Sequence, residues 1–270
     1  MLRKSSLLFC LLLIFIGPLT AAAQDGLSIM NKERYHNRAN TSQYIYQLAI
    51  VHQNGELAHR KFKRFSKKYK NDYKYSIFFV EPEDYKNMSL LMFDPNKDGK
   101  LSDSWIYLPE SQRVKRIINS NKGLSFAESD ITYSDLEGLD YENWDHKVIG
   151  SNKPCGDKTC WIIQSKPKKD MKKLLLKKTK YRSYKSWVDK DSFLLMKREI
   201  KLRKKGRKKI FEVKSFEKQD GYWFYTRAEI KVYYKNKVRS TTVVDVSNMK
   251  FDQDLPNSIF TQNKMKRGVR

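Results

Sequence analysis

The sequence lacks the short motifs that mark most enzymes. Its histidines form no HExxH pair, no GxSxG elbow is present, and no glycine-rich phosphate loop follows a predicted strand. Asp145 and His146 are the one pair that suggests half of a catalytic dyad, but neighbouring residues of a strand point to opposite faces of a sheet. We therefore expect His146 to be structural, and we expect neither enzymatic activity nor a cofactor.

Glycine and proline are also scarce, with 11 and 7 among the 270 residues. They form no Pro/Gly/Ser-rich tract, and no segment repeats with a fixed period, so nothing marks a linker between domains. We expect residues 24–270 to form a single domain.

Long apolar runs are absent outside the N-terminus. The run over residues 7–19 follows two basic residues and precedes small residues at 21–23, which is typical of a signal peptide. It is shorter than the roughly 20 residues of a membrane span. Cys10 lies inside the run and not at a cleavage site, which argues against a lipid-modified N-terminus. We expect cleavage near Ala23 and a soluble exported protein.

Alternating apolar runs, in contrast, recur along the whole chain. Turn signals such as Asn54-Gly55 and Asp220-Gly221 separate them. Many strands joined by short turns predict a mainly β protein, a long antiparallel meander that must curl and close, or be covered, to hide its apolar face. A short helix capped by Asp25 is expected over residues 25–34. The strands are expected at residues 44–51, 57–65, 73–80, 85–93, 105–108, 113–118, 143–151, 160–164, 184–189, 193–202, 210–216, 222–234 and 238–246.

The stretch of residues 105–136 joins two kinds of structure. Residues 105–108 are apolar on both faces of a strand, Pro109 ends the ladder, and residues 113–118 return as the second strand of a hairpin. The alternation is lost in residues 125–136, where apolar residues are spaced among serines and aspartates. This pattern indicates a short capped helix or lid over an apolar groove, and we call it the lid segment. An ordinary loop packed on the sheet is the alternative.

The same stretch resembles a known protein family. WIYLPESQRVKRI and SFAESDITYSDL, together with DGLSIMNKERY, YRSYKSWVDKDSFLLMKREI and DLPNSIFTQNKMKR elsewhere in the chain, are similar to the outer-membrane lipoprotein-sorting family, the periplasmic carriers of the LolA/LolB type. The resemblance covers most of the chain beyond the signal peptide. It implies an incomplete β-barrel with short helices over its concave face, and an inner-membrane pump of the lipid-exporting type as a partner.

A carrier of acyl chains needs an apolar cavity, because each buried methylene contributes about 0.8 kcal/mol. In this hypothesis the acyl chains of a lipoprotein or lipid lie in the cavity, and the lid segment is a gate of low local stability. Asp130 and Asp135 are expected to hold the ends of the lid through backbone N–H groups. The candidate ligand-binding residues are Trp105, Tyr107, Phe126, Tyr133 and Leu136.

Acidic residues are outnumbered, 30 against 55 Lys and Arg, and residues 166–209 alone hold 20 basic residues against four acids. Because export removes nucleic acid as a partner, we expect an anionic membrane surface, lipopolysaccharide or a cell-wall polymer. A solvated face that keeps the protein soluble is the alternative. A second functional hypothesis is therefore a binding module that docks on such a surface, or on a pump, without carrying lipid. The candidate residues for the anionic surface are Lys172, Lys173, Lys177, Lys178, Arg203, Lys204 and Lys205.

Two further patterns concern cysteine and calcium. Cys155 and Cys160 flank a short turn between two strands, and export favours a disulfide, while metal binding would need a second ligand pair.

Asp94, Asn96, Asp98 and Gly99 match the opening of a calcium loop, but Trp105 stands where the bidentate Glu belongs. We therefore favour an Asx-rich turn over a metal site.

Overall fold

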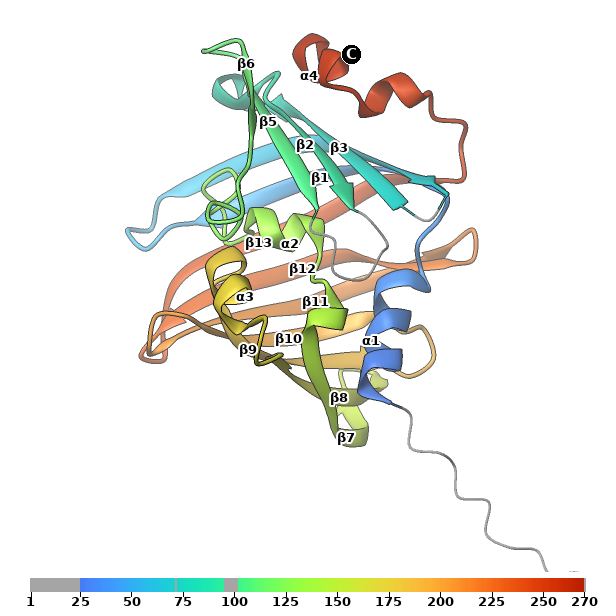
Figure 1. Ribbon diagram of the computed structural model, residues 1–270, viewed down its shortest axis with the longest axis vertical. Coiled ribbons are helices and arrows are strands. Elements are labelled where there is room, and N and C mark those ends of the chain that lie inside the picture. Colours follow the sequence, from blue (N-terminus) through green and yellow to red (C-terminus); the bar gives the residue numbers. More distant parts are fainter. Residues whose placement is uncertain (1–24, 71, 95–101, 270) are drawn as a thin grey trace, which may run out of the picture.

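The computed structural model describes residues 25–70, 72–94 and 102–269, and it contains one antiparallel sheet of 13 strands (Figure 1). The order of strands across the sheet is β6-β5-β4-β3-β2-β1-β13-β12-β11-β10-β9-β8-β7. The strands are β1 (Thr41–Val51), β2 (Leu57–Tyr69), β3 (Asp72–Glu81), β4 (Ser89–Asp94), β5 (Asp103–Leu108), β6 (Arg113–Arg116), β7 (Trp144–Cys155), β8 (Lys158–Pro167), β9 (Tyr181–Asp189), β10 (Leu195–Leu202), β11 (Arg207–Gln219), β12 (Tyr222–Tyr234) and β13 (Lys237–Phe251).

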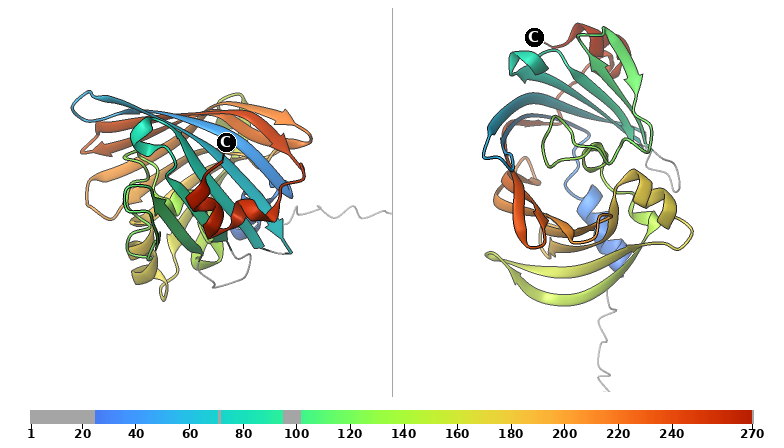
Figure 2. Two further views of the ribbon diagram at one scale, coloured as in Figure 1. Left: turned by 90° about the horizontal axis from the view of Figure 1, so that it is seen from above. Right: turned by 90° about the vertical axis from the view of Figure 1, so that its left-hand side faces the viewer.

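The first and last strands of the chain meet in the middle of this sheet, because β1 pairs with β13. The two edges are then β6 and β7, which are consecutive in sequence but lie at opposite ends of the strand order. The segment of residues 117–143 must cross from one edge to the other. It runs through the hollow of the curled sheet, as Figure 2 shows, and it contains the lid segment.

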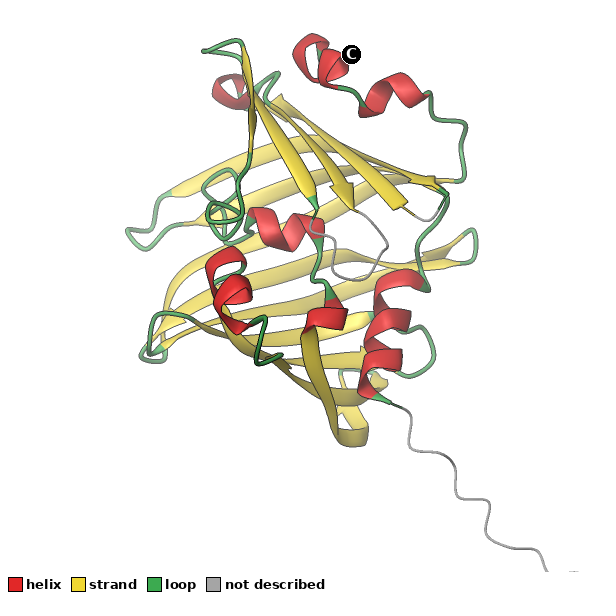
Figure 3. Cartoon of the chain, in the orientation of Figure 1, coloured by secondary structure: helices red, strands yellow, loops and turns green. Residues whose placement is uncertain are grey.

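Helices lie on both sides of the sheet (Figure 3). On the concave side are α1 (Gly26–Tyr35), α2 (Tyr133–Glu137), η2 (Tyr141–Asn143) and α3 (Lys172–Lys178), while η1 (Glu83–Tyr85) links β3 to β4. On the outer face, η3 (Asn257–Phe260) packs against β3 and α4 (Gln262–Arg267) packs against β4. The C-terminal segment therefore covers the outer face near β3 and β4, while the lid segment and three short helices lie on the concave side.

The alternation of side chains along the strands explains this two-sided packing. On β2, Phe62 faces inward and joins a buried cluster with residues of the lid segment, while Phe65 faces outward. The outer cluster contains Phe65 and Tyr107 from the sheet and Phe260 from the C-terminal segment. Strand β2 therefore buries apolar side chains on both faces of the sheet.

The predicted fold class is confirmed. The protein is mainly β, the strands follow one another as a meander, and the sheet does not close into a barrel. Helix α1 is also where the sequence places it, with Asp25 accepting a hydrogen bond from the Ser28 backbone N–H at 3.3 Å. The strand expected at residues 85–93 is wrong in its first half, since η1 and a turn precede Ser89. Ser89 and the next three residues are buried, whereas residues 83–87 lie toward solvent.

The structure contains the disulfide between Cys155 and Cys160, which closes the turn between β7 and β8. The signal-peptide residues 1–23 lie outside the described residues, as do Asn96, Asp98 and Gly99 of the calcium-like loop. Asp94 is described, and its carboxylate pairs with Arg34 and Arg38. No helix within the described ranges has the length and apolarity needed to cross a membrane.

Candidate functional site

A cavity of about 300 Å³ lies on the concave side of the sheet, beneath the lid segment. Such a volume is at the lower end of the roughly 300–1,000 Å³ found for small-molecule sites. Side chains from α1, the lid segment and strands on both halves of the sheet enclose it. Its apolar lining comprises Phe62, Ile131, Leu136, Leu139, Leu195, Ile200, Phe211, Ile230 and Val244.

The polar part of this lining is strongly basic, because Arg34, Arg38, Arg64, Arg198 and Lys209 all reach the cavity. Four of these cations have a carboxylate partner. Arg34 and Arg38 pair with Asp94 at 2.7 and 3.3 Å, Arg198 lies 3.7 Å from Glu33, and Lys209 lies 2.6 Å from Asp135. The fifth cation, Arg64, has no carboxylate partner among the described residues.

The C-terminal part of the lid segment forms the capped first turn of α2. The Thr132 hydroxyl accepts from the Asp135 backbone N–H, and the Asp135 carboxylate accepts in return from the Thr132 backbone N–H at 2.8 Å, which forms a capping box. The same carboxylate accepts hydrogen bonds from Lys209 on β11 and from the hydroxyl of Tyr181 on β9. Burial alone would raise the pKa of Asp135, but Lys209 and these hydrogen bonds outweigh it and lower that pKa.

Asp130 fixes the other end of the lid segment, although not in the predicted way. Its carboxylate accepts hydrogen bonds from the hydroxyls of Ser240 and Thr242 on β13, and not from backbone N–H groups. Burial raises the pKa of this carboxyl group. Lys209 also donates to the Asp130 carbonyl at 3.1 Å, so one ammonium group links both Asp130 and Asp135 of the lid segment to β11.

An aromatic cluster anchors the lid segment to the concave face of the sheet. Phe126 is fully buried and forms aromatic contacts with Phe62, Phe79 and Tyr133, with ring centroids 5.3–5.9 Å apart. Such pairs contribute beyond their buried area. Any movement of the lid segment away from the sheet would have to disrupt this aromatic cluster.

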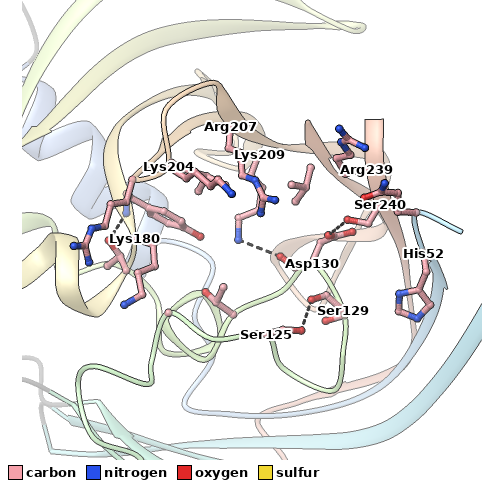
Figure 4. Close-up of a pocket in the computed structure, with 18 residues that line it drawn as sticks. His52, Ser125, Ser129, Asp130, Lys180, Lys204, Arg207, Lys209, Arg239 and Ser240 are labelled. Atoms are coloured by element: carbon pink, nitrogen blue, oxygen red, sulfur yellow. Dashed lines mark hydrogen bonds between the residues drawn. The ribbon is translucent and has the colours of Figure 1, made fainter. Parts of the chain in front are cut away.

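A second hollow, which we call the mouth pocket, lies at the end of the sheet where the lid segment meets the β10–β11 turn (Figure 4). Its volume is about 750 Å³. Asp130 is the single acid among the described residues that line it, and Lys209 borders both this pocket and the cavity. The basic lining residues are Lys180, Arg203, Lys204, Arg207, Lys209 and Arg239.

The structure separates the predicted ligand-binding residues into two groups. Trp105 and Tyr107 point to the outer face and pack under the C-terminal segment, so their assignment to the cavity is wrong. Phe126 and Tyr133 of the lid segment pack into the cluster on the concave side, and Leu136 lines the cavity itself. The lid segment thus supplies the predicted residues on the concave side, while strand β5 turns its two largest aromatics away.

Six of the seven predicted anionic-surface residues are exposed, on α3 and on the β10–β11 turn. These two elements adjoin, because the Arg203 backbone N–H donates to the Lys180 carbonyl at 2.7 Å. Lys178 is the exception. It is 5% exposed and its ammonium group lies 3.4 Å from Glu137, so it belongs to a buried ion cluster and not to the surface.

His146 has two partners that agree with a structural role. One ring nitrogen lies 2.8 Å from the Ser165 hydroxyl, and the other lies 3.0 Å from the Tyr141 carbonyl. Burial lowers the pKa of His146. Within the described residues, no group of three or more His, Cys, Asp or Glu side chains is placed to hold a metal ion.

A family model described as "-like: Uncharacterized protein" matches residues 71–267, more than half of the chain. The chain belongs to that family. A search of curated proteins found no match.

Solved structures resemble the protein over nearly its whole length. A DUF1329 family protein from Desulfovibrio piger is 26% identical, with a TM-score of 0.78 over 89% of this chain and 97% of its own. An outer membrane lipoprotein-sorting protein domain from Vibrio parahaemolyticus is 22% identical, with a TM-score of 0.78 over 90% and 98%. A LolA superfamily protein from Nitrosomonas europaea is 18% identical, with a TM-score of 0.62 over 89% and 99%. These structures confirm the resemblance to the lipoprotein-sorting family at the level of the fold.

Some residues of the site were missed by the sequence reasoning. Arg64 follows Phe62 by two positions, so the two-residue period of a strand places both side chains on the inner face of the sheet. From sequence alone, however, a basic residue is expected to face solvent. Lys209 is the last residue of the basic segment 166–209, and nothing else in the sequence singles it out. Neither position carries a local signal for burial, because the space that receives these side chains is created by distant elements.

Proposed function

We propose that this protein is a periplasmic carrier that encloses the acyl chains of a lipid or lipoprotein in the concave cavity and passes them toward the outer membrane, with an inner-membrane exporter as its source. The observation that carries the proposal is the cavity beneath the lid segment in a LolA-like fold. The neighbour described as a lipoprotein-sorting domain supports the same class of cargo.

The energetics of acyl transport agree with this arrangement. An acyl chain in water loses about 0.8 kcal/mol for each exposed methylene relative to an apolar site, so a carrier must surround it. The cavity offers aliphatic and aromatic side chains from both halves of the sheet. The lid segment lies over the cavity, so this apolar surface does not form an exposed patch on the outside of the molecule.

The deciding experiment is mass spectrometry of the gently purified protein. We expect a bound molecule with an acyl chain, and an apolar fluorescent dye should compete with it for the cavity. If no acyl-bearing ligand is found and the dye detects no apolar site, the carrier proposal fails. The alternative, a periplasmic module that docks on an anionic surface or a pump, would then stand.

The mouth pocket and the exposed cations beside it support a contact with an anionic surface, for the carrier and for the alternative alike. Lysines on α3 surround the half-buried Leu174 and Leu176, so their ammonium groups can reach head groups while the apolar side chains lie at the acyl boundary. Basic residues near a membrane contribute about 1 kcal/mol each, and salt screens that attraction.

We expect the double variant Lys172→Gln/Lys173→Gln to bind anionic liposomes on the order of tenfold more weakly than the wild type. Sedimentation with vesicles of increasing anionic lipid content measures this, and binding should weaken as salt rises. The matched control is Lys218→Gln/Lys250→Gln, which removes two exposed lysines from the opposite end of the sheet. Equal losses in both variants, or binding that ignores salt, would contradict a specific basic surface.

A further inference from the structure

Arg64 on β2 is an unusual cation for the inside of a protein. Its side chain lines the cavity, and its Nε–H is shielded from solvent without a hydrogen-bond acceptor. Among the described residues, no carboxylate lies within ion-pair distance. The other four cations of the cavity each lie within ion-pair distance of a carboxylate, with Arg34 and Arg38 sharing that of Asp94. Among the described residues, Arg64 is the one cation of the lining without such a contact.

Tyrosines surround this guanidinium group. Tyr44 lies opposite Arg64 on β1, the ring of Tyr75 lies 4.8 Å from the guanidinium carbon, and Tyr46 and Tyr225 line the same cavity. Burial raises the pKa of Tyr44 to about 12 and also raises the pKa values of Tyr75 and Tyr225. These three phenols are therefore neutral at physiological pH and supply hydroxyl groups, but no negative charge.

The Tyr75 hydroxyl is a second unsatisfied group at this place. It is shielded from solvent and has no hydrogen-bond partner. The face of the Tyr75 ring makes a cation–π contact with the guanidinium group. This contact satisfies neither the Nε–H of Arg64 nor the Tyr75 hydroxyl, and both lack a hydrogen-bond partner. Buried polar groups are normally satisfied, and an uncompensated buried charge is costly, so the missing partner is an anion that accepts hydrogen bonds.

We propose that Arg64 binds the anionic end of an acyl-bearing ligand, a carboxylate or a phosphate, inside the cavity. The ligand's acyl chain then lies along the apolar lining near Ile131 and Leu136, and its charged end reaches the tyrosine-lined floor. This inference rests on the proposed carrier function and narrows the class of ligand. It favours acidic amphiphiles, whose charged end would also be buried, over ligands that bury only a neutral acyl chain. Guanidinium groups suit both anions, which they bind through paired N–H donors.

Three ligands of equal chain length test the proposal: decanoate, decyl phosphate and decanol. We expect the delipidated wild-type protein to bind at least one of the two anions about 10- to 100-fold more tightly than decanol, as measured by displacement of an apolar dye. The stronger of the two anions identifies the head group. In Arg64→Met the preference for the anion should fall to near unity while the affinity for decanol is unchanged, and Arg64→Lys should keep much of the preference.

Stability provides an independent readout. Because Arg64 has no carboxylate partner, replacing it with Met should leave the melting temperature of the ligand-free protein equal or higher. The control Arg227→Met removes a 55% exposed arginine from β12 and should change neither the preference nor the melting temperature. If none of the three ligands binds, the carrier function itself fails. If decanol binds as tightly as the anions, or Arg64→Met unfolds the protein, the carrier stands and the anion site is refuted.

Discussion

Glu137→Gln is expected to lower the free energy of unfolding by about 3–5 kcal/mol. Glu137 is 2% exposed, and its carboxylate lies 2.7 Å from the Lys122 ammonium group and 3.4 Å from that of Lys178. The hydroxyls of Ser102 and Ser104 also donate to it. Glutamine keeps the shape but removes the charge, so two buried ammonium groups lose their only carboxylate in this cluster.

The loss should be visible as a fall in melting temperature of roughly 6–20 °C, since about 1 kcal/mol shifts a protein of this size by roughly 2–4 °C. Glu83→Gln is the control, because its side chain is 82% exposed and its partner Lys86 is on the surface. That substitution should change the free energy of unfolding by no more than about 0.5 kcal/mol. A melting temperature for Glu137→Gln within two or three degrees of the wild type would show that the buried lysines are already neutral.

The strands were predictable because their signal is local. The alternation of apolar residues and the turn pairs between runs act within ten residues or so, and every strand of the sheet overlaps a predicted run. The capped helix in the lid was predictable for the same reason, since Thr132 and Asp135 form its capping box. The order of strands across the sheet was not predictable, because the pairing of β1 with β13 joins residues about 190 to 210 positions apart in the sequence.

The site was less predictable than the fold, because its ion pairs join residues that are far apart in the sequence. Arg34 pairs with Asp94 on β4, and Glu137 lies within ion-pair distance of Lys178 on α3. Within a basic segment, no local sequence pattern distinguishes a lysine that will be buried from one that will be exposed. The error at Trp105 has a similar cause, because the C-terminal segment covers the outer face and gives that aromatic residue a buried place away from the cavity.

Leu136→Glu is expected to lower lipid occupancy at least about tenfold while the melting temperature changes by only a few degrees. Leu136 is the neighbour of Glu137 in α2, but it is only partly buried and lines the cavity. In the empty cavity a carboxylate at this position can meet water and the cations of the lining. Once an acyl chain fills the cavity, the same carboxylate loses its water, so the substitution opposes binding far more than folding.

Two control variants distinguish a cavity residue from a core residue. Leu136→Met preserves apolar volume and should keep the occupancy of the wild type. Leu90→Glu introduces the same charge at a residue of the concave core that is 0% exposed, and it should prevent folding. Melting temperature and lipid occupancy of all three variants are measured together. If Leu136→Glu unfolds as Leu90→Glu does, and its remaining folded fraction still carries lipid, Leu136 belongs to the core and the lid segment does not close over the ligand.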